Sequence, residues 1–396
     1  MDFSNLDKNQ KIQIIDQSTV STTSNIQSGM DYQGIEWETI MPGLGRKFYR
    51  RQRHLRLKPL QSTFKTFPRK EKLPNNSIYN FSKYYRQLPM FIAHFQLRHN
   101  LACVSKYDFI HAKPSGFYKF STLDYSVKNY EYPEEFIPIC LSYANGYAVS
   151  GGIRGELAIY DLQEEKVRHF GKATDNNQYL NCTKIYNDEG QLKLITGAND
   201  WCVRIYSMKY LTEPLFCQKM GAPVNNCSVS PTNMSIIAVC GDQKEIEILD
   251  VRTNKVALKL YGHEDDNFAS DWHPNGVFLA TGSQDLTCRV WDIRKPLEEY
   301  HTLQSEIASV SNVKFVAGGQ FLVFSEGVDY LSIYDFQKEC EVYQRVDAFG
   351  DVTGMDVDPE ANGTLFFGMR LKDYEGVFEY SLGKRSTKKL LEESFL

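Results

Sequence analysis

His263, Thr281 and Asp285 bring an imidazole, a hydroxyl and a carboxylate into one short segment that ends with Trp291 and Asp292. A base, a nucleophile and an orienting acid are the groups of a catalytic triad. A triad is defined by its geometry and by access to a substrate, which residue types alone do not supply. The sequence also lacks the GxSxG, P-loop and HExxH signatures. We therefore predict no catalytic residue and no enzyme activity.

The side chains that could bind a metal are scattered along the chain. The eight histidines form no pair at ligand spacing with a third donor nearby, and the nine cysteines include no CxxC pair. The segment "HEDDN" (263–267) gathers three acidic residues, and a solvated loop is its simpler interpretation. Most cysteines lie in apolar segments, which favours buried thiols and a reducing compartment. We expect no metal, no cofactor and a location in the cytoplasm or the nucleus.

A repeat organises most of the chain. Strand-like segments that end in Asp or Ser recur as "LAIYD", "VRIYS", "IEILD", "CRVWD", "LSIYD" and "VFEYS". Their final residues are Asp161, Ser207, Asp250, Asp292, Asp335 and Ser381. The intervals are 46, 43, 42, 43 and 46 residues, and apolar segments alternate inside them with turn-forming clusters such as "HPNG" and "SPTN". A unit of this kind is typical of a four-stranded propeller blade.

The spacing predicts an all-β, seven-bladed β-propeller. Six units are explicit, and the alternating segment 90–123 supplies a first, degenerate blade. A single blade cannot bury both of its faces, so the blades must stack and close into a ring. We expect an N-terminal extension over residues 1–90, the propeller over residues 91–381 and a C-terminal tail over residues 382–396. No run approaches 18 apolar residues and no secretory signal is recognisable, so no membrane association is expected.

The chain resembles the WD-repeat β-propellers in His263, in Asp285 and in the dipeptide Trp291-Asp292. The segments "DYQGIEWE", "FQLRHNLACVSKYD" and "FASDWHPNGVFLATGSQDLTCRVWD" are also similar to an uncharacterised WD-repeat family of fungi and plants. These resemblances imply a fold and a location but no activity. The WD-repeat pattern further implies that His263, Thr281, Asp285 and Trp291 form a buried hydrogen-bonded brace within one blade. Such a brace gives the indole N–H and the hydroxyl the partners that buried polar groups need.

Arg294 matches a second pattern of the WD-repeat proteins. The segment "CRVWDIR" fits the WDxR box of the substrate receptors of cullin-RING ubiquitin ligases, and the preceding unit ends similarly in "IEILDVR" with Arg252. In that family the two arginines project from adjacent blades and dock on the ligase adaptor, a task that suits the guanidinium fork. An arginine at this position also occurs in ordinary blades, where it caps a strand end or meets water.

Charge is distributed unevenly along the chain. Between Arg46 and Arg86 there are 13 Lys or Arg residues against one acidic residue, so this basic arm carries +12 and the rest of the chain −16. Its first part contains Arg46, Lys47, Arg50, Arg51, Arg53, Arg56 and Lys58. The arm is open to four interpretations: it binds nucleic acid, it is a nuclear-import signal, it pairs with an acidic protein, or it lies on its own acidic propeller. Ile35 and Trp37, just before the arm, are placed to dock on an apolar surface.

These features favour a non-catalytic scaffold or adaptor whose partners are other proteins, because propellers present rigid loops around a central channel. Two alternatives follow from particular residues. One is a substrate receptor of a cullin-RING ubiquitin ligase that binds the ligase adaptor through Arg252 and Arg294. The other is an RNA- or DNA-associated factor that uses the basic arm.

Overall fold

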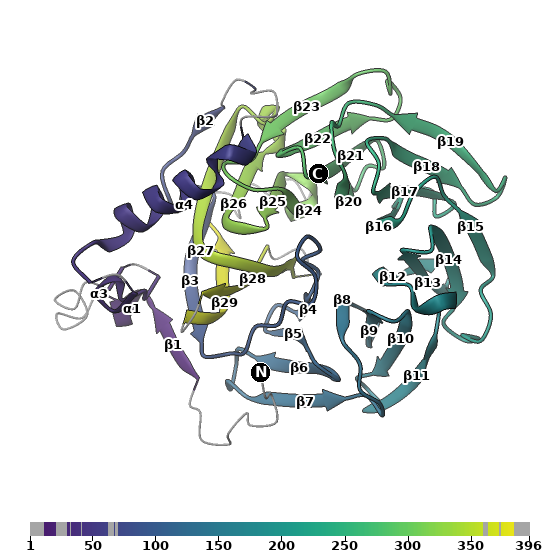
Figure 1. Cartoon of the computed structure of the whole chain (residues 1–396), viewed down its shortest axis with the longest axis horizontal. Helices are drawn as coiled ribbons and strands as arrows, with labels where there is room; N and C mark the ends of the chain where they lie inside the picture. The colour runs from purple at the N-terminus through teal and green to yellow at the C-terminus, as the bar shows by residue number, and fades with distance from the viewer. Residues whose placement is uncertain are drawn as a thin grey trace, which may run out of the picture.

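The computed structural model describes residues 12–20, 30–31, 33–40, 42–61, 67, 70–358, 363–371 and 374–383. Its sheets are arranged around a common axis, with the inner strand of each sheet nearest the centre (Figure 1). The predicted all-β class is confirmed. The expected C-terminal tail lies almost wholly outside the described residues.

Five sheets have four antiparallel strands each, in chain order from the axis outward. The first contains β4 (Leu101–Ser105), β5 (Asp108–Lys113), β6 (Gly116–Ser121) and β7 (Val127–Glu131). The second contains β8 (Pro138–Ala144), β9 (Tyr147–Gly152), β10 (Glu156–Asp161) and β11 (Lys166–Lys172). The third contains β12 (Leu180–Asp188), β13 (Gln191–Ala198), β14 (Cys202–Ser207) and β15 (Phe216–Lys219). The fourth contains β16 (Val224–Val229), β17 (Ile236–Gly241), β18 (Ile246–Asp250) and β19 (Lys255–Leu260). The fifth contains β20 (Asn267–Trp272), β21 (Phe278–Ser283), β22 (Thr287–Asp292) and β23 (Glu299–Gln304).

The sixth sheet has nine strands because β27 (Val342–Val357) continues without a break. Residues 343–347 of β27 pair with β26, and residues 351–357 pair with β28. The other strands are β24 (Val310–Val316), β25 (Phe321–Glu326), β26 (Val328–Asp335), β28 (Leu365–Leu371), β29 (Tyr374–Leu382), β3 (Tyr79–Arg86), β1 (Gln13–Asp16) and the parallel β2 (Glu71–Lys72).

The strand β3 closes the ring. It pairs in antiparallel fashion with β29, the last strand of the described residues, and the ring of Tyr84 stacks on Phe378 at 4.2 Å between centroids. The repeat spacing places residues 79–86 in the N-terminal extension, whereas the structure places them inside the sheet. The reason is that an outer strand belongs to whichever sheet edge it reaches in space, and the edge at β29 is nearly 300 residues away along the chain.

The hydrophobic core lies between neighbouring sheets. Trp272, Leu279 and Trp291 of the fifth sheet form one cluster with residues of the fourth, such as Ile248. A central strand is therefore covered on both faces, and every residue of β22 is buried. The outer strand β19 instead alternates exposed and half-buried residues, as expected for a strand with one solvated face. This difference explains why the central strands of each repeat read as continuous apolar runs.

Within the described residues, three helices precede the ring: α1 (Gln17–Val20), α3 (Trp37–Ile40) and α4 (Gly45–Gln61). In Figure 1 the long helix α4 passes over the strands β26 and β27. Among the described residues, no helix has the length and apolar character needed to span a membrane.

Candidate functional site

The structure brings His263, Thr281, Asp285 and Trp291 together inside the fifth sheet. His263 Nδ1 lies 2.8 Å from Asp285 Oδ2, and His263 Nε2 lies 2.9 Å from Thr281 Oγ1. The indole N–H of Trp291 donates to the same hydroxyl at 2.8 Å. Thr281 is on β21, Trp291 is on β22, and the other two residues are in the turns at one end of these strands. The four residues form a continuous hydrogen-bonded brace.

This brace has no room for a substrate. All four side chains are buried, and the Thr281 hydroxyl is held between the imidazole and the indole. Burial lowers the pKa of His263 although Asp285 opposes this effect, so the imidazole is neutral near pH 7. The imidazole, hydroxyl and carboxylate thus contact one another as in a triad, but here their hydrogen bonds stabilise the blade.

Arg252 and Arg294 occupy equivalent places on adjacent sheets, in the turns after β18 and β22. Each contacts the aspartate two residues before it: Arg252 Nε lies 3.5 Å from Asp250, and Arg294 donates to Asp292 from Nε at 2.9 Å and from Nη2 at 2.7 Å. Their side chains are 67% and 65% exposed, so neither guanidinium is used up by the fold. The two predicted partner-binding residues therefore face solvent at the same edge of the ring.

The basic arm begins as α4, and the side of this helix that carries Arg46, Arg50 and Arg53 lies on the ring. Arg53 donates two hydrogen bonds to Asp329, from Nε at 2.8 Å and from Nη2 at 3.2 Å. Arg50 reaches the same carboxylate at 3.3 Å, and Arg46 contributes through other acidic residues. Asp329 is fully buried, so the two guanidinium groups supply the positive charge that this carboxylate requires.

Aromatic rings complete the contact between the arm and the ring of sheets. The guanidinium of Arg50 lies 4.1 Å from the centre of the Tyr330 ring and 4.0 Å from that of Phe349, within the range of cation–π attraction. Trp37 meets Phe349 edge to face at 4.9 Å. Ile35 and Trp37 are both buried there, which confirms that the segment before the arm docks on an apolar surface.

The opposite side of α4 faces solvent with Lys47, Arg51 and Arg56, whose side chains are exposed. Lys58 also lies on α4, and its side chain is outside the described part. Among the interpretations of the arm, the geometry of α4 favours docking on the chain's own propeller. Of the six lysine and arginine side chains described on α4, three therefore contact the ring and three face solvent.

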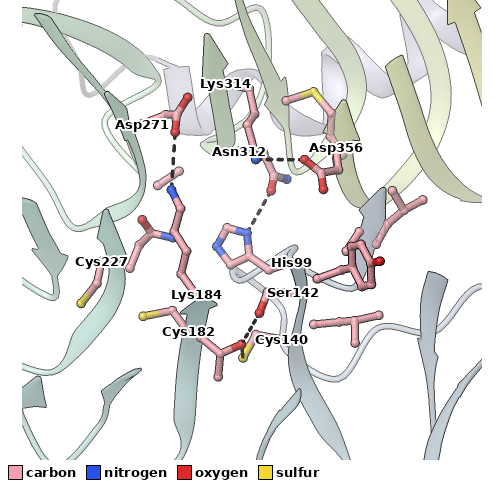
Figure 2. A pocket seen from close by; sticks show the side chains of 18 of the residues that line it. His99, Cys140, Ser142, Cys182, Lys184, Cys227, Asp271, Asn312, Lys314 and Asp356 are labelled. Carbon is pink, nitrogen blue, oxygen red and sulfur yellow. Dashed lines mark hydrogen bonds and ion pairs between the residues drawn. The ribbon is translucent and has the colours of Figure 1, made fainter. Parts of the chain in front are cut away.

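A cavity of about 310 Å³ lies on the axis of the ring, between inner strands (Figure 2). Lysine and aspartate alternate on its wall: Lys184 on β12, Asp271 on β20, Lys314 on β24 and Asp356 on β27. Lys314 Nζ lies 2.9 Å from Asp356, and Lys184 Nζ lies 3.7 Å from Asp271. The charge of Asp356 raises the pKa of Lys314, whereas burial lowers the pKa of Lys184 despite Asp271.

One end of this cavity is closed by the segment between β3 and β4, residues 87–100, which we call the plug. Figure 1 shows the chain that leads into β4 extending into the centre of the ring. Leu97 of the plug packs with Ile139 and Phe268, and all three are buried. His99 spans the axis, with 2.9 Å between its Nδ1 and Asn312 Oδ1 (Figure 2). Among the described residues, the plug thus covers one end of the cavity.

Aromatic side chains are exposed on the face that carries the plug. Phe95, Tyr179 and Trp201 are 76%, 39% and 41% exposed. The ring of His94 lies 4.9 Å from Phe95 and 6.2 Å from Tyr179. The Tyr179 carbonyl accepts the N–H of Asn199 at the turn that also holds Trp201. We call Phe95, Tyr179 and Trp201 the aromatic face.

Comparisons with known proteins agree with this geometry. A family model described as "WD domain, G-beta repeat" matches residues 254–292, the segment that contains the whole brace. The chain contains a WD repeat. Among solved structures, a chain in "Crystal Structure of Mitotic Checkpoint Complex" matches this WD-repeat protein with a TM-score of 0.63 and 14% identity, over 80% of this chain and 97% of that chain. That likeness concerns the fold alone.

Curated relatives of this WD-repeat protein are distant. It is 25% identical over 158 residues to U3 small nucleolar RNA-associated protein 21 homolog of Schizosaccharomyces pombe, covering 39% of this chain and 17% of that protein. It is 24% identical over 220 residues to guanine nucleotide-binding protein subunit beta of Zea mays, covering 50% of this chain and 57% of that protein. The chain thus spans less than two thirds of either relative. The narrower resemblance to a fungal and plant family stays a prediction.

Three features of the site were not predicted from the sequence: the charged cavity, the plug and the buried partner of the arm. A signal for the cavity was present, because a lysine or an aspartate interrupts each of the apolar strand segments "LNCTKIY", "FASDW", "SNVKF" and "GMDV". Such an interruption marks a polar residue on an inner strand. It does not reveal which charges meet across the axis of this WD-repeat protein.

Proposed function

We propose that this protein is a seven-bladed, non-catalytic propeller that acts as a protein-interaction scaffold in the nucleus or the cytoplasm. Seven blades follow if β27 serves two of them, as the outer strand of one and the inner strand of the next. The absence of catalysis is supported by the brace, which encloses the one triad-like set of residues that the sequence suggested.

The aromatic face is the observation that carries the scaffold proposal. Exposed aromatic side chains that gather on one face of a rigid ring are typical of a surface that binds another protein. Aromatic residues also dominate binding energy where they become fully buried at an interface. Phe95 belongs to the plug, which is anchored two residues further on by the buried contacts of Leu97.

An affinity purification with quantitative mass spectrometry tests this proposal. The double variant Phe95→Ser and Trp201→Ser should lose specific partners that the wild type recovers. The matched control is Tyr210→Ser, which removes a 66% exposed aromatic ring from the turn after β14, at the other end of the ring. Identical partner lists for the wild type and the double variant would remove the aromatic face as the binding surface.

A second candidate is a substrate receptor of a cullin-RING ubiquitin ligase. It is favoured by the matched exposure of Arg252 and Arg294 on adjacent sheets, each oriented by the preceding aspartate. Changing both arginines to alanine should abolish recovery of the ligase adaptor while the partners of the aromatic face remain. Unchanged recovery of the adaptor, or no adaptor with the wild type, rejects the receptor function.

RNA association is the remaining alternative, and the names of two relatives, U3 small nucleolar RNA-associated protein 21 homolog and Pre-mRNA-processing factor 19, give it support. The arm has fewer free charges for it than the sequence suggested, because Arg46, Arg50 and Arg53 make internal ion pairs. Binding of this kind should weaken steeply with salt and disappear in the variant Lys47→Ala, Arg51→Ala. Binding that ignores both changes would exclude the arm as a nucleic-acid surface.

A further inference from the structure

The axial cavity contains a cation whose partners within the fold are incomplete. An ammonium group donates three hydrogen bonds. Among the described residues, the ion-pair partner of Lys184 is Asp271, whose Oδ1 lies 3.7 Å from Nζ. This distance exceeds that of a hydrogen bond. The Lys184 side chain remains 40% exposed on the cavity wall.

The other lysine of the wall is a useful contrast. Lys314 Nζ contacts Asp356 at 2.9 Å, and the same carboxylate accepts the backbone N–H of Cys103 at 2.9 Å. The ion pair and the hydrogen bond from Cys103 together link the inner strands β24, β27 and β4. The fold therefore gives Lys314 an acceptor at hydrogen-bond distance and leaves Lys184 with a more distant one (Figure 2).

Asn226 places a second donor on the same wall. Its Oδ1 accepts both the backbone N–H and the hydroxyl of Ser270, at 3.2 and 2.9 Å. These two contacts orient the side-chain amide of Asn226. Its NH₂ group has no acceptor in the described part of the chain. Asn226 lines the cavity, as does Lys184 on the adjacent inner strand.

We propose that this cavity binds a carboxylate group, with the Lys184 ammonium and the Asn226 amide as its donors. A carboxylate offers several lone pairs and makes charge-assisted hydrogen bonds to such donors. Burial is the main cause of the lowered pKa of Lys184, and the charges of Asp271 and Asp356 oppose this effect. Because the plug closes one end, the group enters end-on. It belongs to an acidic side chain or chain terminus of a partner, or to a free small carboxylate.

This inference is independent of the aromatic face, which lies at the closed end of the cavity. Its test is saturation-transfer NMR with the full chain and two small probes, glutarate and its neutral isostere glutaramide. Glutarate should show saturable binding and glutaramide should not. Lys184→Met should weaken glutarate binding at least tenfold. The control Lys193→Met removes a lysine of the same sheet that is paired at 2.6 Å with Asp188, and it should leave the binding unchanged.

Two further probes distinguish the source of the carboxylate and test for cation binding. An acetylated hexapeptide with one central glutamate that binds at least tenfold more tightly than glutarate assigns the site to a partner chain, and the reverse order assigns it to a small carboxylate. Methylguanidinium is the cationic probe: if it binds and Asp271→Asn abolishes that binding, the cavity takes cations and the proposal is wrong. Equal affinity for glutarate and glutaramide on the wild type also overturns it, even if a variant fails to fold.

Discussion

Replacing Asp329 by asparagine tests how the basic arm is held on the ring. The substitution removes the negative charge that Arg50 and Arg53 share and keeps a hydrogen-bond acceptor of similar size. Asp329 has a positive φ of 67°, a conformation in which asparagine is well tolerated. The backbone should therefore stay in place while the ion pairs are lost.

The expected cost follows from burial. Breaking a buried ion pair costs about 3–5 kcal/mol because one charge is left without compensation. Arg50 and Arg53 are 16% and 24% exposed, and Arg50 keeps its contacts with two aromatic rings, which reduces the expected loss to about 2 kcal/mol. A difference of this size raises the population of the undocked helix roughly 30-fold.

Hydrogen exchange followed by mass spectrometry measures this population. Peptides that cover α4 should exchange roughly 30-fold faster in Asp329→Asn than in the wild type. Asp188→Asn provides the control, because it removes a half-exposed carboxylate that is paired with Lys193 on a distant sheet. Unchanged protection of α4, or equal acceleration in both variants, would refute the view that this buried carboxylate holds the arm.

The remaining predictions concern the brace, the histidines and the plug. Thr281→Val should lower the free energy of unfolding by about 2–4 kcal/mol, because the indole N–H and the imidazole lose their shared partner; Thr253→Val on an exposed turn is the control in urea unfolding. All eight histidines have lowered pKa values, and burial brings that of His111 to about 4. Below pH 6.5 the unfolded histidines take up protons that the folded ones do not, so His111 alone should lower stability by about 3 kcal/mol between pH 6.5 and pH 4, whereas Glu326, whose pKa burial raises to about 7, acts in the opposite direction. His111→Gln should therefore reduce the loss of stability between pH 7 and pH 5, and a urea midpoint with the same pH dependence in wild type and variant would contradict this. Leu97→Ala should destabilise the plug by about 2–5 kcal/mol and speed its hydrogen exchange, because the substitution opens a void at the closed end of the cavity. Unchanged hydrogen exchange in the plug would show that the plug does not depend on this contact.

The brace is the part of the candidate site that could be predicted from the sequence. Its four residues fall within one repeat unit, so their spacing along the chain is nearly the same as their arrangement in the blade. The docking of the arm on the ring could not be predicted in this way. Arg50 and Arg53 read as free positive charges because Asp329, which binds both, is 276 residues beyond Arg53 in the chain and lies in an apolar strand segment.

The amino-acid sequence by itself determined the blades, their turns and the brace, because these depend on residues that are close in the chain and on the alternation of apolar side chains. Tertiary structure alone decided three other features. These are the closing of the ring by β3, the docking of α4 on a buried carboxylate and the meeting of Lys184 with Asp271 across the axial cavity. Each depends on which distant segments share an edge, a face or an axis, and no local pattern of residue types carries that information.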